Sequence, residues 1–575
     1  MSERWRDRAV IAASALLAMV VLGPALGPGY ALVGDQVFVP DQVLLPWMVG
    51  LGGGLPRAVP QDTVLAVLTG PVPGWVWQSL ALLAALVLLG TGTARLARPA
   101  GRRAALVAAT VGVWSPFVAE RLLIGHWSLL LAVGALPWAL HHARAARDGV
   151  PGARARWLLV LALASLTVTG GLLVLVVSGA VLLWRGGASY GGRSLTAGCG
   201  VALQLPWLVP ALLHPGSAPG GADVFALRPE GPWGALVTAL GTGGLWNAAA
   251  VPASRGTVLA PLLTLVLLGL AAFGRRRAAV VLGRPVTVVL VVASVTGLAV
   301  ALLGVWWPAA TDAVVGHLPG GGLLRDGQKW LAPWLVLLSV AAGCGAARIG
   351  SATAARARDG LAGSAVLVAA LLLPLACLPD LAWGALGRLA TVDYPADWEQ
   401  VRTALAADPA PGDVVALPWS TFRAFAWNDG RTVLDPAPRF LTRTVVTDQD
   451  LVVDRHGTLV VVPGDDPRAA RVGAALRSGH DVAAVLQREG IGWAVVEGAG
   501  DAGLPPGAQP VAGGADLRLY RLAAPDPVPQ PTGAGAVLAG NLAALLVVLA
   551  AAVVVARDTV RSRRAMRQRG GPTGW

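Results

Sequence analysis

Residues 257–277 read TVLAPLLTLVLLGLAAFGRRR, an apolar segment of membrane-spanning length followed at once by three arginines. A helix needs about 20 predominantly apolar residues to cross a bilayer, and the same pairing of apolar segment and basic cluster recurs along the chain. The basic clusters occupy 4–8, 95–103, 144–156, 185–193, 275–284, 348–358 and the tail from Arg557. Because arginine and lysine accumulate in cytoplasmic loops, these clusters predict one cytoplasmic side that includes both termini.

The composition excludes an ordinary soluble protein. Hydrophobic residues make up 55% of the chain, charged residues 13%, and the mean hydropathy is +0.63, whereas soluble domains carry roughly 25% charged residues. We therefore expect a multi-pass protein of the plasma (inner) membrane. The net charge of +13 does not indicate nucleic acid as a partner, because the arginines flank apolar segments instead of forming one basic face. Anionic membrane lipids are the expected partner.

Apolar segments predict a mainly α, polytopic membrane protein with about twelve transmembrane helices of roughly 20 residues. The clear candidates are 9–27, 76–94, 104–119, 127–143, 195–213, 257–273, 285–304, 330–347, 361–379 and 533–556. The stretch 157–184 is predicted to form two short helices with a break at Thr169-Gly170-Gly171, because a single span would move Arg275–Arg277 to the opposite side. The first segment is expected to remain as an anchor rather than to be a cleaved signal peptide.

One charged segment interrupts this pattern and divides the chain into 1–379, a multi-span domain, 380–531, and 532–575, a last helix with a basic cytoplasmic tail. Within 380–531, predicted strands alternate with predicted helices, which favours a small extracytoplasmic α/β domain inserted before the last helix. The strands are expected at 413–418, 458–462, 491–497 and 516–521, and the helices at 395–408 and 467–489.

The first outer loop, GYALVGDQVFVPDQVLLPW (29–47), carries Asp35 and Asp41 just after the first span. A carboxylate in a partly dry cleft at the membrane surface can have its pKa raised enough to act as a general base. The alternative is that both acids only solvate the loop and cap a helix.

Two further outer turns concentrate ionisable residues. The stretch WSPFVAERLLIGHWSLL (114–130) places Glu120, Arg121 and His126 within seven positions, where function is favoured over simple membrane anchoring. The stretch GGGLLRDGQKW (320–330) carries Asp326 and Gln328.

This second turn also contains Lys329, the only lysine of the chain. A compact ammonium suits a phosphate oxygen, although a membrane anchor is the alternative. If the segment is helical, Arg325 lies four residues earlier on the same face. The three glycines 320–322 would let the backbone approach a ligand closely.

The long outer loop 214–256 is expected to be functional or mobile. Its polar and aromatic residues are His214, Asp223, Arg228, Glu230, Trp233 and Trp246. The tryptophans could stack on sugar rings or belong to an interfacial aromatic belt.

Several phrases of the chain resemble the GT-C class of polytopic glycosyltransferases, especially the N-terminal membrane part of actinobacterial α-(1→3)-arabinofuranosyltransferases. They are the acid at Asp35, SPFVAERLLIGHW, LLRDGQKW, and, in the charged segment, YPADW, LPWSTFRAFAWNDGRTVLDPAPR and VVPGDDPRA. The resemblance implies an inverting transfer of sugar from a polyprenyl-phosphate donor to a cell-envelope glycan or glycolipid. The chain departs from the class in lacking D-x-D or E-x-D in the first loop, so a divalent metal is uncertain and no other cofactor is expected. The long carbohydrate-binding C-terminal extension of the larger arabinosyltransferases is also not expected in this protein.

The resemblance implies the following roles. Asp35, with Asp41 as the nearest substitute, would be the general base. The lipid phosphate would be held by Arg325, Lys329, Arg121 and His126, with Glu120, Asp326 and Gln328 in support. Apart from the resemblance, the charged segment offers polar loops but no recognisable nucleophile–base set, so it is predicted to bind the acceptor through Trp419 and Trp427; the alternative is that either tryptophan belongs to the core.

Two alternatives remain, a lipid or glycan transporter and a non-catalytic scaffold of envelope assembly. A transporter would be expected to show internal repeats or ionisable residues at the bilayer midplane, and neither is obvious in the sequence. An enzyme, unlike a scaffold, requires Asp35, His126, Arg325 and Lys329 to converge on one outer cavity.

Overall fold

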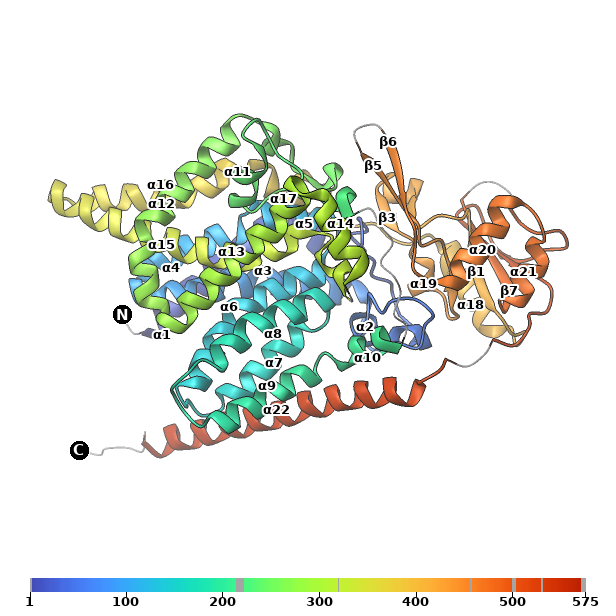
Figure 1. Cartoon of the computed structure of the whole chain (residues 1–575), viewed down its shortest axis with the longest axis horizontal. Helices are drawn as coiled ribbons and strands as arrows, with labels where there is room; N and C mark the ends of the chain where they lie inside the picture. Colours follow the sequence, from blue (N-terminus) through green and yellow to red (C-terminus); the bar gives the residue numbers. More distant parts are fainter. Residues whose placement is uncertain are drawn as a thin grey trace.

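The structure is a computed structural model of the whole chain, and it describes residues 3–213, 222–318, 320–455, 458–498, 503–528 and 531–569. It has two parts, a bundle of long helices and an α/β domain at one end of that bundle (Figure 1). The last helix, α22 (Ala534–Arg569), runs back from the α/β domain along the bundle, so that both chain termini lie at the opposite end.

Seven helical segments of the described chain are long and apolar enough to cross a membrane. They contain α1 (Glu3–Leu22), α3 (Gly74–Ala97), α4 (Arg102–Val113) with α5 (Pro116–Leu123), α13 (Arg284–Trp306), α15 (Ala332–Ala357), α16 (Gly360–Cys377) and α22. An eighth arises if the bent pair α9 (Tyr190–Ala202) and α10 (Leu205–Leu213) is one span. The chain is therefore a polytopic membrane protein, as its composition predicts.

The remaining predicted spans are also helical, although the count of about twelve exceeds the seven or eight that length and composition support in the described chain. Two long helices, α6 (Trp127–Arg147) and α12 (Leu259–Leu282), coincide with 127–143 and 257–273. Two short helices, α7 (Ala153–Ala164) and α8 (Val168–Leu182), confirm the prediction that the stretch 157–184 forms two helices instead of one.

The break within 157–184 lies earlier than predicted. Helix α7 ends at Ala164 and the chain turns at 165–167, so Thr169, Gly170 and Gly171 lie in the first turn of α8. The glycines are needed for packing rather than for the turn, because a Cβ on Gly170 would lie 2.4 Å from the Cβ of Ala132 on α6.

Small residues allow the helices at the centre of the bundle to approach closely. Helix α15 packs against α4 and α12. A Cβ on Gly274 of α12 would lie 2.0 Å from the carbonyl oxygen of Ala341, and one on Gly345 of α15 would lie 2.0 Å from that of Leu270. Glycines at such crossings are typical of membrane helices, whose association depends on close van der Waals packing.

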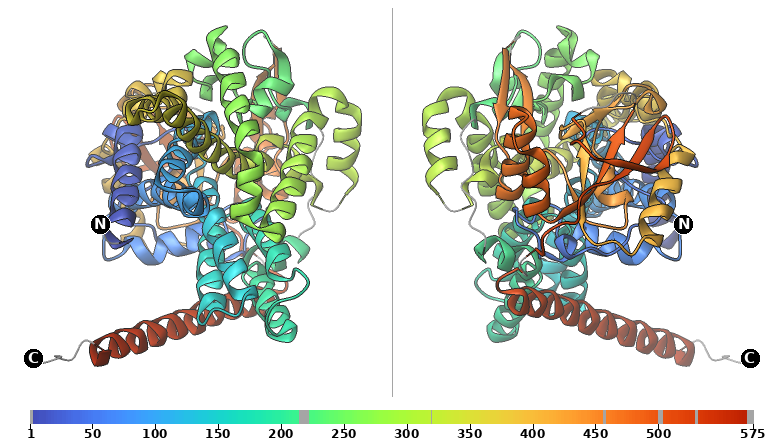
Figure 2. Two further views of the ribbon diagram at one scale, coloured as in Figure 1. Left: turned by 90° about the vertical axis from the view of Figure 1, so that its left-hand side faces the viewer. Right: turned by 90° about the vertical axis from the view of Figure 1, so that its right-hand side faces the viewer.

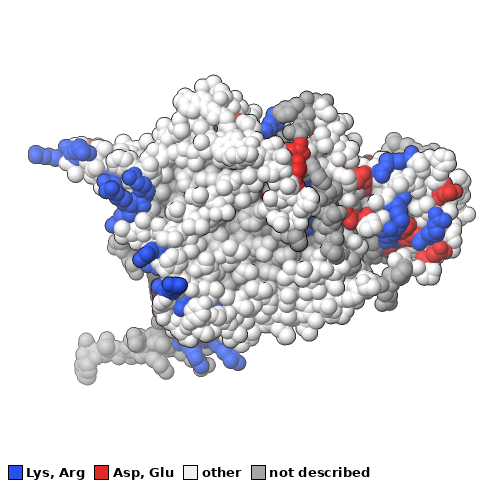
Figure 3. Space-filling view, viewed as in Figure 1, with Lys and Arg blue, Asp and Glu red and all other residues white. Residues whose placement is uncertain are grey.

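Charged residues are distributed unevenly over the surface (Figure 3). On the face shown, lysine and arginine gather at the end of the bundle that holds the termini, and the α/β domain carries both signs of charge. Between them the bundle surface is almost free of charged side chains, as expected for a belt in contact with lipid.

The α/β domain contains a five-stranded sheet of order β4-β1-β7-β9-β8. Its strands are β1 (Asp413–Leu417), β4 (Val445–Val446), β7 (Ile491–Glu497), β8 (Gln509–Gly513) and β9 (Leu517–Arg521). Strand β1 pairs in parallel with β4 and β7, whereas β9 is antiparallel to β7 and β8. Helices α18 (Ala396–Ala407), α20 (Pro467–Ser478) and α21 (Val482–Arg488) confirm the predicted helical segments.

Two hairpins lie outside this sheet. The first joins β2 (Phe422–Ala424) to β3 (Thr432–Leu434), and the second joins β5 (Leu451–Arg455) to β6 (Thr458–Val462). The predicted strand 458–462 is thus a hairpin strand, not a strand of the main sheet. Figure 2 shows this second hairpin at the edge of the molecule, where Val453 and Val462 pack against Val224 and Phe225 of the outer loop.

Short elements connect the long helices and the strands. They are α2 (Gln61–Thr69), α11 (Gly234–Leu240), α14 (Pro308–His317), α17 (Ala382–Leu386), α19 (Ala437–Phe440) and the 3-10 turns η4 (Ala222–Phe225), η6 (Ala253–Gly256), η7 (Gly321–Leu324) and η8 (Gly327–Leu331).

Candidate functional site

The loop that follows the first span, residues 29–47, is held between the bundle and the α/β domain. The amide of Gly34 donates to the carbonyl of Thr432, and the amide of Leu434 donates back to Gly34, at 2.9 and 2.8 Å. On the bundle side, the amide of Asp35 donates to the carbonyl of Ile124 at 2.9 Å. The position of Asp35 is therefore fixed from both sides.

Two glycines make this contact possible. Gly34 and Gly125 have φ values of +50° and +82°, a region that residues with a Cβ rarely adopt. A Cβ on Gly34 would lie 2.2 Å from the oxygen of Ile124, and one on Gly125 would lie 2.3 Å from the amide nitrogen of Gln36. The loop and the turn between α5 and α6 can touch only because both positions lack side chains.

This contact brings Asp35 to His126. The Nε2 atom of His126 lies 3.0 Å from Oδ2 of Asp35, and its Nδ1 lies 2.9 Å from NH1 of Arg121. A guanidinium only donates hydrogen bonds, so Nδ1 must accept and Nε2 must carry the proton that is donated to Asp35. These contacts define a neutral histidine with a fixed tautomer.

The chain of contacts continues into the turn that carries the single lysine. Arg121 donates from NH1 and NH2 to the two carboxylate oxygens of Asp326 at 2.5 and 2.8 Å. The Nζ atom of Lys329 lies 3.7 Å from Oδ2 of Asp326. The structure therefore joins three segments through the contacts Asp35, His126, Arg121, Asp326 and Lys329, in this order, which we call the polar chain.

The two ends of the polar chain are accessible and its middle is buried. The side chains of Asp35 and Lys329 are 46% and 25% exposed, whereas that of Arg121 is fully buried. The sequence predicts that Arg121 holds the donor phosphate, but its buried position means that it orients His126 and Asp326 instead. The exposed ends are the groups that a ligand could reach.

Electrostatics favour an ionised Asp35 beside a neutral His126. Burial raises the pKa of Asp35, but the hydrogen bond from His126 and the positive charges of Lys329 and Arg439 outweigh it, so the net shift is downward. Burial lowers the pKa of His126, and the nearby Arg121 and Lys329 lower it further against the opposing effect of Asp35. The raised pKa that the sequence suggests for Asp35 is therefore not what the structure gives, because cations surround the carboxylate.

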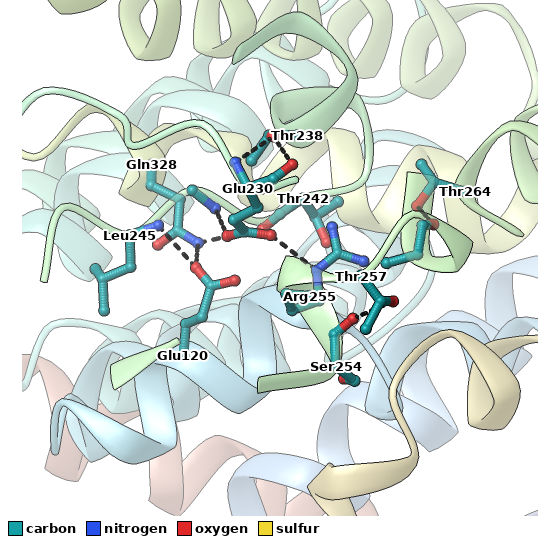
Figure 4. A network of polar contacts seen from close by, with 12 residues as sticks. Glu120, Glu230, Thr238, Thr242, Leu245, Ser254, Arg255, Thr257, Thr264 and Gln328 are labelled. Carbon is teal, nitrogen blue, oxygen red and sulfur yellow. Dashed lines mark hydrogen bonds and ion pairs between the residues drawn. The ribbon is translucent and has the colours of Figure 1, made fainter. Parts of the chain in front are cut away.

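Glu120 and Gln328 belong to a second, buried network on the other side of the same segments (Figure 4). Oε2 of Glu120 accepts hydrogen bonds from the amide of Leu245 and from Nε2 of Gln328, at 2.8 and 2.5 Å. Glu230 accepts from the amide of Gly244 at 2.5 Å.

The same network contains an ion pair, in which Nε of Arg255 lies 2.8 Å from Oε2 of Glu230. Sequence reasoning does not predict this role of Arg255. The only signal is its occurrence in an outer loop, where arginine is rare in this chain. Of the polar residues noted in that loop, His214 lies outside the described residues.

Asp41 and Arg325 lie apart from the polar chain. Asp41 forms an ion pair with Arg402 of α18 at 2.8 Å and so connects the first loop to the α/β domain. The guanidinium of Arg325 stacks over the ring of Phe225 at 5.0 Å, and burial lowers its pKa. The predicted helix that would align Arg325 with Lys329 is absent, because η7 ends before Arg325 and η8 begins after Asp326.

The two tryptophans predicted to bind acceptor pack into the α/β domain. Trp427 stacks on Phe425 with ring centroids 4.8 Å apart, within a cluster that includes Tyr394 and Trp398. Trp419 packs against the core between the main sheet and α20. Both tryptophans are partly buried, so they contribute to the packing of this domain.

Within the described ranges, no group of three or more histidine, cysteine, aspartate or glutamate side chains is arranged to hold a metal ion. The polar chain can nevertheless perform acid–base chemistry at one end and bind an anion at the other. Asp35 can accept a proton, and Lys329 offers a cation nearby that is close enough to lower the pKa of Asp35.

No protein-family profile matches the chain, and no curated protein matches it in sequence. In a comparison of structures, the chain matches a cryo-EM structure of the arabinofuranosyltransferase AftD from mycobacteria with a TM-score of 0.51 and 18% sequence identity. The match covers 92% of this chain and 42% of the other, so the chain spans less than half the length of that protein. The chain thus shares the fold of the matched part of that arabinofuranosyltransferase, as the resemblance of its sequence phrases predicts.

Proposed function

We propose that the protein is a membrane glycosyltransferase that transfers a sugar from a polyprenyl-phosphate donor to an extracytoplasmic glycan or glycolipid of the cell envelope. The observation that carries this proposal is the polar chain. The carboxylate of Asp35 and the ammonium of Lys329 are accessible at its two ends, and the residues that connect them are largely buried. The fold shared with AftD, an arabinofuranosyltransferase, supports the same class of reaction.

In the proposed reaction, Asp35 accepts the proton of the acceptor hydroxyl as that oxygen attacks the anomeric carbon of the sugar. The bond from the anomeric carbon to the phosphate oxygen breaks, and the lipid phosphate leaves with the bonding electrons. Lys329 binds the phosphate and offsets the charge that develops on it, which is where preorganised electrostatics contribute most. His126 holds the Asp35 carboxylate in place through a neutral hydrogen bond, and attack opposite the leaving group inverts the anomeric centre.

The proposed topology places the polar chain on the extracytoplasmic side of the plasma membrane. It is supported by the arginines at the opposite end of the bundle, where both termini lie, since positive residues are retained in the cytoplasm. The α/β domain would then cover the extracytoplasmic end and hold the first loop.

The test uses purified full-length protein with polyprenyl-phosphate arabinofuranose and an envelope glycan acceptor. Asp35→Asn preserves shape but removes proton acceptance, so turnover should fall by about 10²–10⁴-fold while donor binding changes little. Asp41→Asn is a matched control, because both side chains are 46% exposed and Asp41 is paired with Arg402 instead of His126. Near-normal turnover in folded Asp35→Asn protein would exclude the mechanism and favour a non-catalytic scaffold or a transporter.

A further inference from the structure

The carboxyl groups of Glu120 and Glu230 meet in the buried network of Figure 4, although they come from α5 and from a loop more than a hundred residues later. Glu120 is fully buried, and the side chain of Glu230 is 3% exposed. A Cβ on Gly243 would lie 2.6 and 2.8 Å from the oxygens of Glu230 and 3.0 Å from Oε1 of Glu120, so a residue without a side chain leaves room for the pair.

A hydrogen bond between two carboxyl groups requires a proton. The donors around Glu120, the amide of Leu245 and the side chain of Gln328, both point to Oε2. The other oxygen, Oε1, is buried beside the Glu230 carboxylate at Gly243 and has no hydrogen-bond partner within the described chain. The oxygen of Glu120 that faces Glu230 is therefore the atom where a proton completes the network.

Charge balance leads to the same conclusion. Among the described residues, Arg255 is the cation that pairs with this network, and it bonds to Glu230. Two adjacent carboxylates beside one arginine would leave a buried charge uncompensated, which is strongly unfavourable. Because the ion pair already stabilises the charge of Glu230, the proton belongs on Glu120.

We propose that Glu120 is a neutral acid that donates a hydrogen bond to the Glu230 carboxylate, and that this pair positions the segment carrying Asp326 and Lys329. The inference rests on the proposed function for its catalytic consequence. Glu120 and Arg121 are neighbours on α5, and they bond to Gln328 and Asp326 respectively. Helix α5 and the turn that carries Lys329 are thus connected twice. One connection is the ion pair between Arg121 and Asp326, and the other is the hydrogen bond from Gln328 to the neutral carboxyl group of Glu120.

The neutral state of Glu120 has a specific use. An ionised carboxylate here would add a negative charge beside Gln328, the neighbour in sequence of Lys329, whose proposed ligand is an anionic phosphate. A protonated glutamic acid makes the same hydrogen bonds without that charge. Glu120 is therefore a positioning residue that fixes the turn and preserves the positive character of its exposed end.

Substitutions at Glu120 separate this role from a general structural one. In Glu120→Gln, the amide oxygen can accept from Leu245 and Gln328 while the amide nitrogen donates to Glu230, so turnover and donor KM should stay within about threefold of wild type. In Glu120→Ala the buried partners lose their bonds, and kcat/KM should fall by roughly 10–100-fold. If Glu120→Gln loses activity as severely as Glu120→Ala, the neutral-acid proposal is overturned.

Infrared spectroscopy of the full-length protein provides a readout that does not depend on activity. A protonated buried carboxyl group gives a C=O band distinct from that of carboxylates, and this band should be present at neutral pH in wild type and disappear in Glu120→Gln. Glu399→Gln is the control, because the side chain of Glu399 is 57% exposed. If no such band is lost in Glu120→Gln, the proposal fails even if Asp35→Asn behaves as expected. If the band is lost but Asp35→Asn retains turnover, the proton assignment stands and only the proposed enzymatic role fails.

Discussion

Oδ2 of Asp35 lies 3.0 Å from Nε2 of His126, although 91 positions separate the two residues in the chain. Arg121 sets the tautomer of His126 by donating to Nδ1, and the same arginine continues to Asp326. This one contact therefore connects the first outer loop to both of the other polar turns. Each member of the arrangement is expected to make a separate, measurable contribution.

Lys329 is expected to bind the donor phosphate. Lys329→Ala should lower kcat/KM by roughly 10–100-fold through both donor binding and turnover, because a charged contact acts in the ground state and the transition state. Lys329→Arg, which keeps the charge but changes its shape, should recover part of the loss. Since Lys329 is the only lysine, an amine-reactive reagent has only this side chain and the N-terminal amine as targets. Donor should slow inactivation by the reagent, and unchanged inactivation in saturating donor would contradict the assignment.

The lowered pKa of His126 predicts that the free energy of unfolding depends on pH. Its folded pKa is lowered, so the folded protein keeps it neutral while the unfolded chain protonates near 6.5. The stability that this shift contributes is fully present above pH 6.5 and is lost progressively as the pH falls below that value. Thermal unfolding between pH 8 and 5.5 should therefore show a weaker pH dependence in His126→Gln than in wild type. Asp35 should not contribute over this range, because its lowered pKa places its titration below 3.8.

Gly34 and Gly125 are expected to tolerate no side chain. Alanine at either position would meet backbone atoms at 2.2–2.3 Å and would also require a positive φ. Both variants should lose turnover and melt at lower temperature. Gly70→Ala should be neutral, because Gly70 has a helical φ of −56° and nothing lies within 4 Å of a Cβ there. Normal turnover in Gly34→Ala would show that the contact between the loop and the turn is not required.

Cysteine labelling tests the proposed topology. An impermeant thiol reagent applied to intact cells should label Ser478→Cys, in the exposed last turn of α20, and should not label Thr559→Cys on α22. The unsubstituted protein, with its three native cysteines, gives the background. The opposite pattern would invert the membrane orientation.

Trp427 is expected to stabilise the α/β domain rather than to bind acceptor. Trp427→Ala removes a partly buried ring from the cluster with Phe425 and Trp398, and each aromatic pair lost typically costs about 0.5–1.5 kcal/mol beyond the area that it buries. The variant should melt earlier and lose donor hydrolysis and acceptor transfer to the same extent. A selective loss of acceptor use, with unchanged melting, would instead restore the acceptor-binding assignment suggested by the sequence.

The sequence by itself determined the membrane class, the α/β insertion and the location of the polar turns. These features depend on local properties, such as apolar length, the position of arginines and the alternation of strands with helices, and each can be recognised within about 20 residues. For the same reason, Asp35, His126 and Lys329 can be recognised as candidates from the residues that flank them in the chain.

The tertiary structure alone decided which candidates meet. Arg325 and Lys329 are four positions apart in the sequence, yet the turn between η7 and η8 sends only Lys329 to Asp326. The contact between Glu120 and Glu230 likewise depends on how a loop folds over α5. Such contacts join distant segments through backbone geometry and packing at glycines, and no local pattern of residues encodes them.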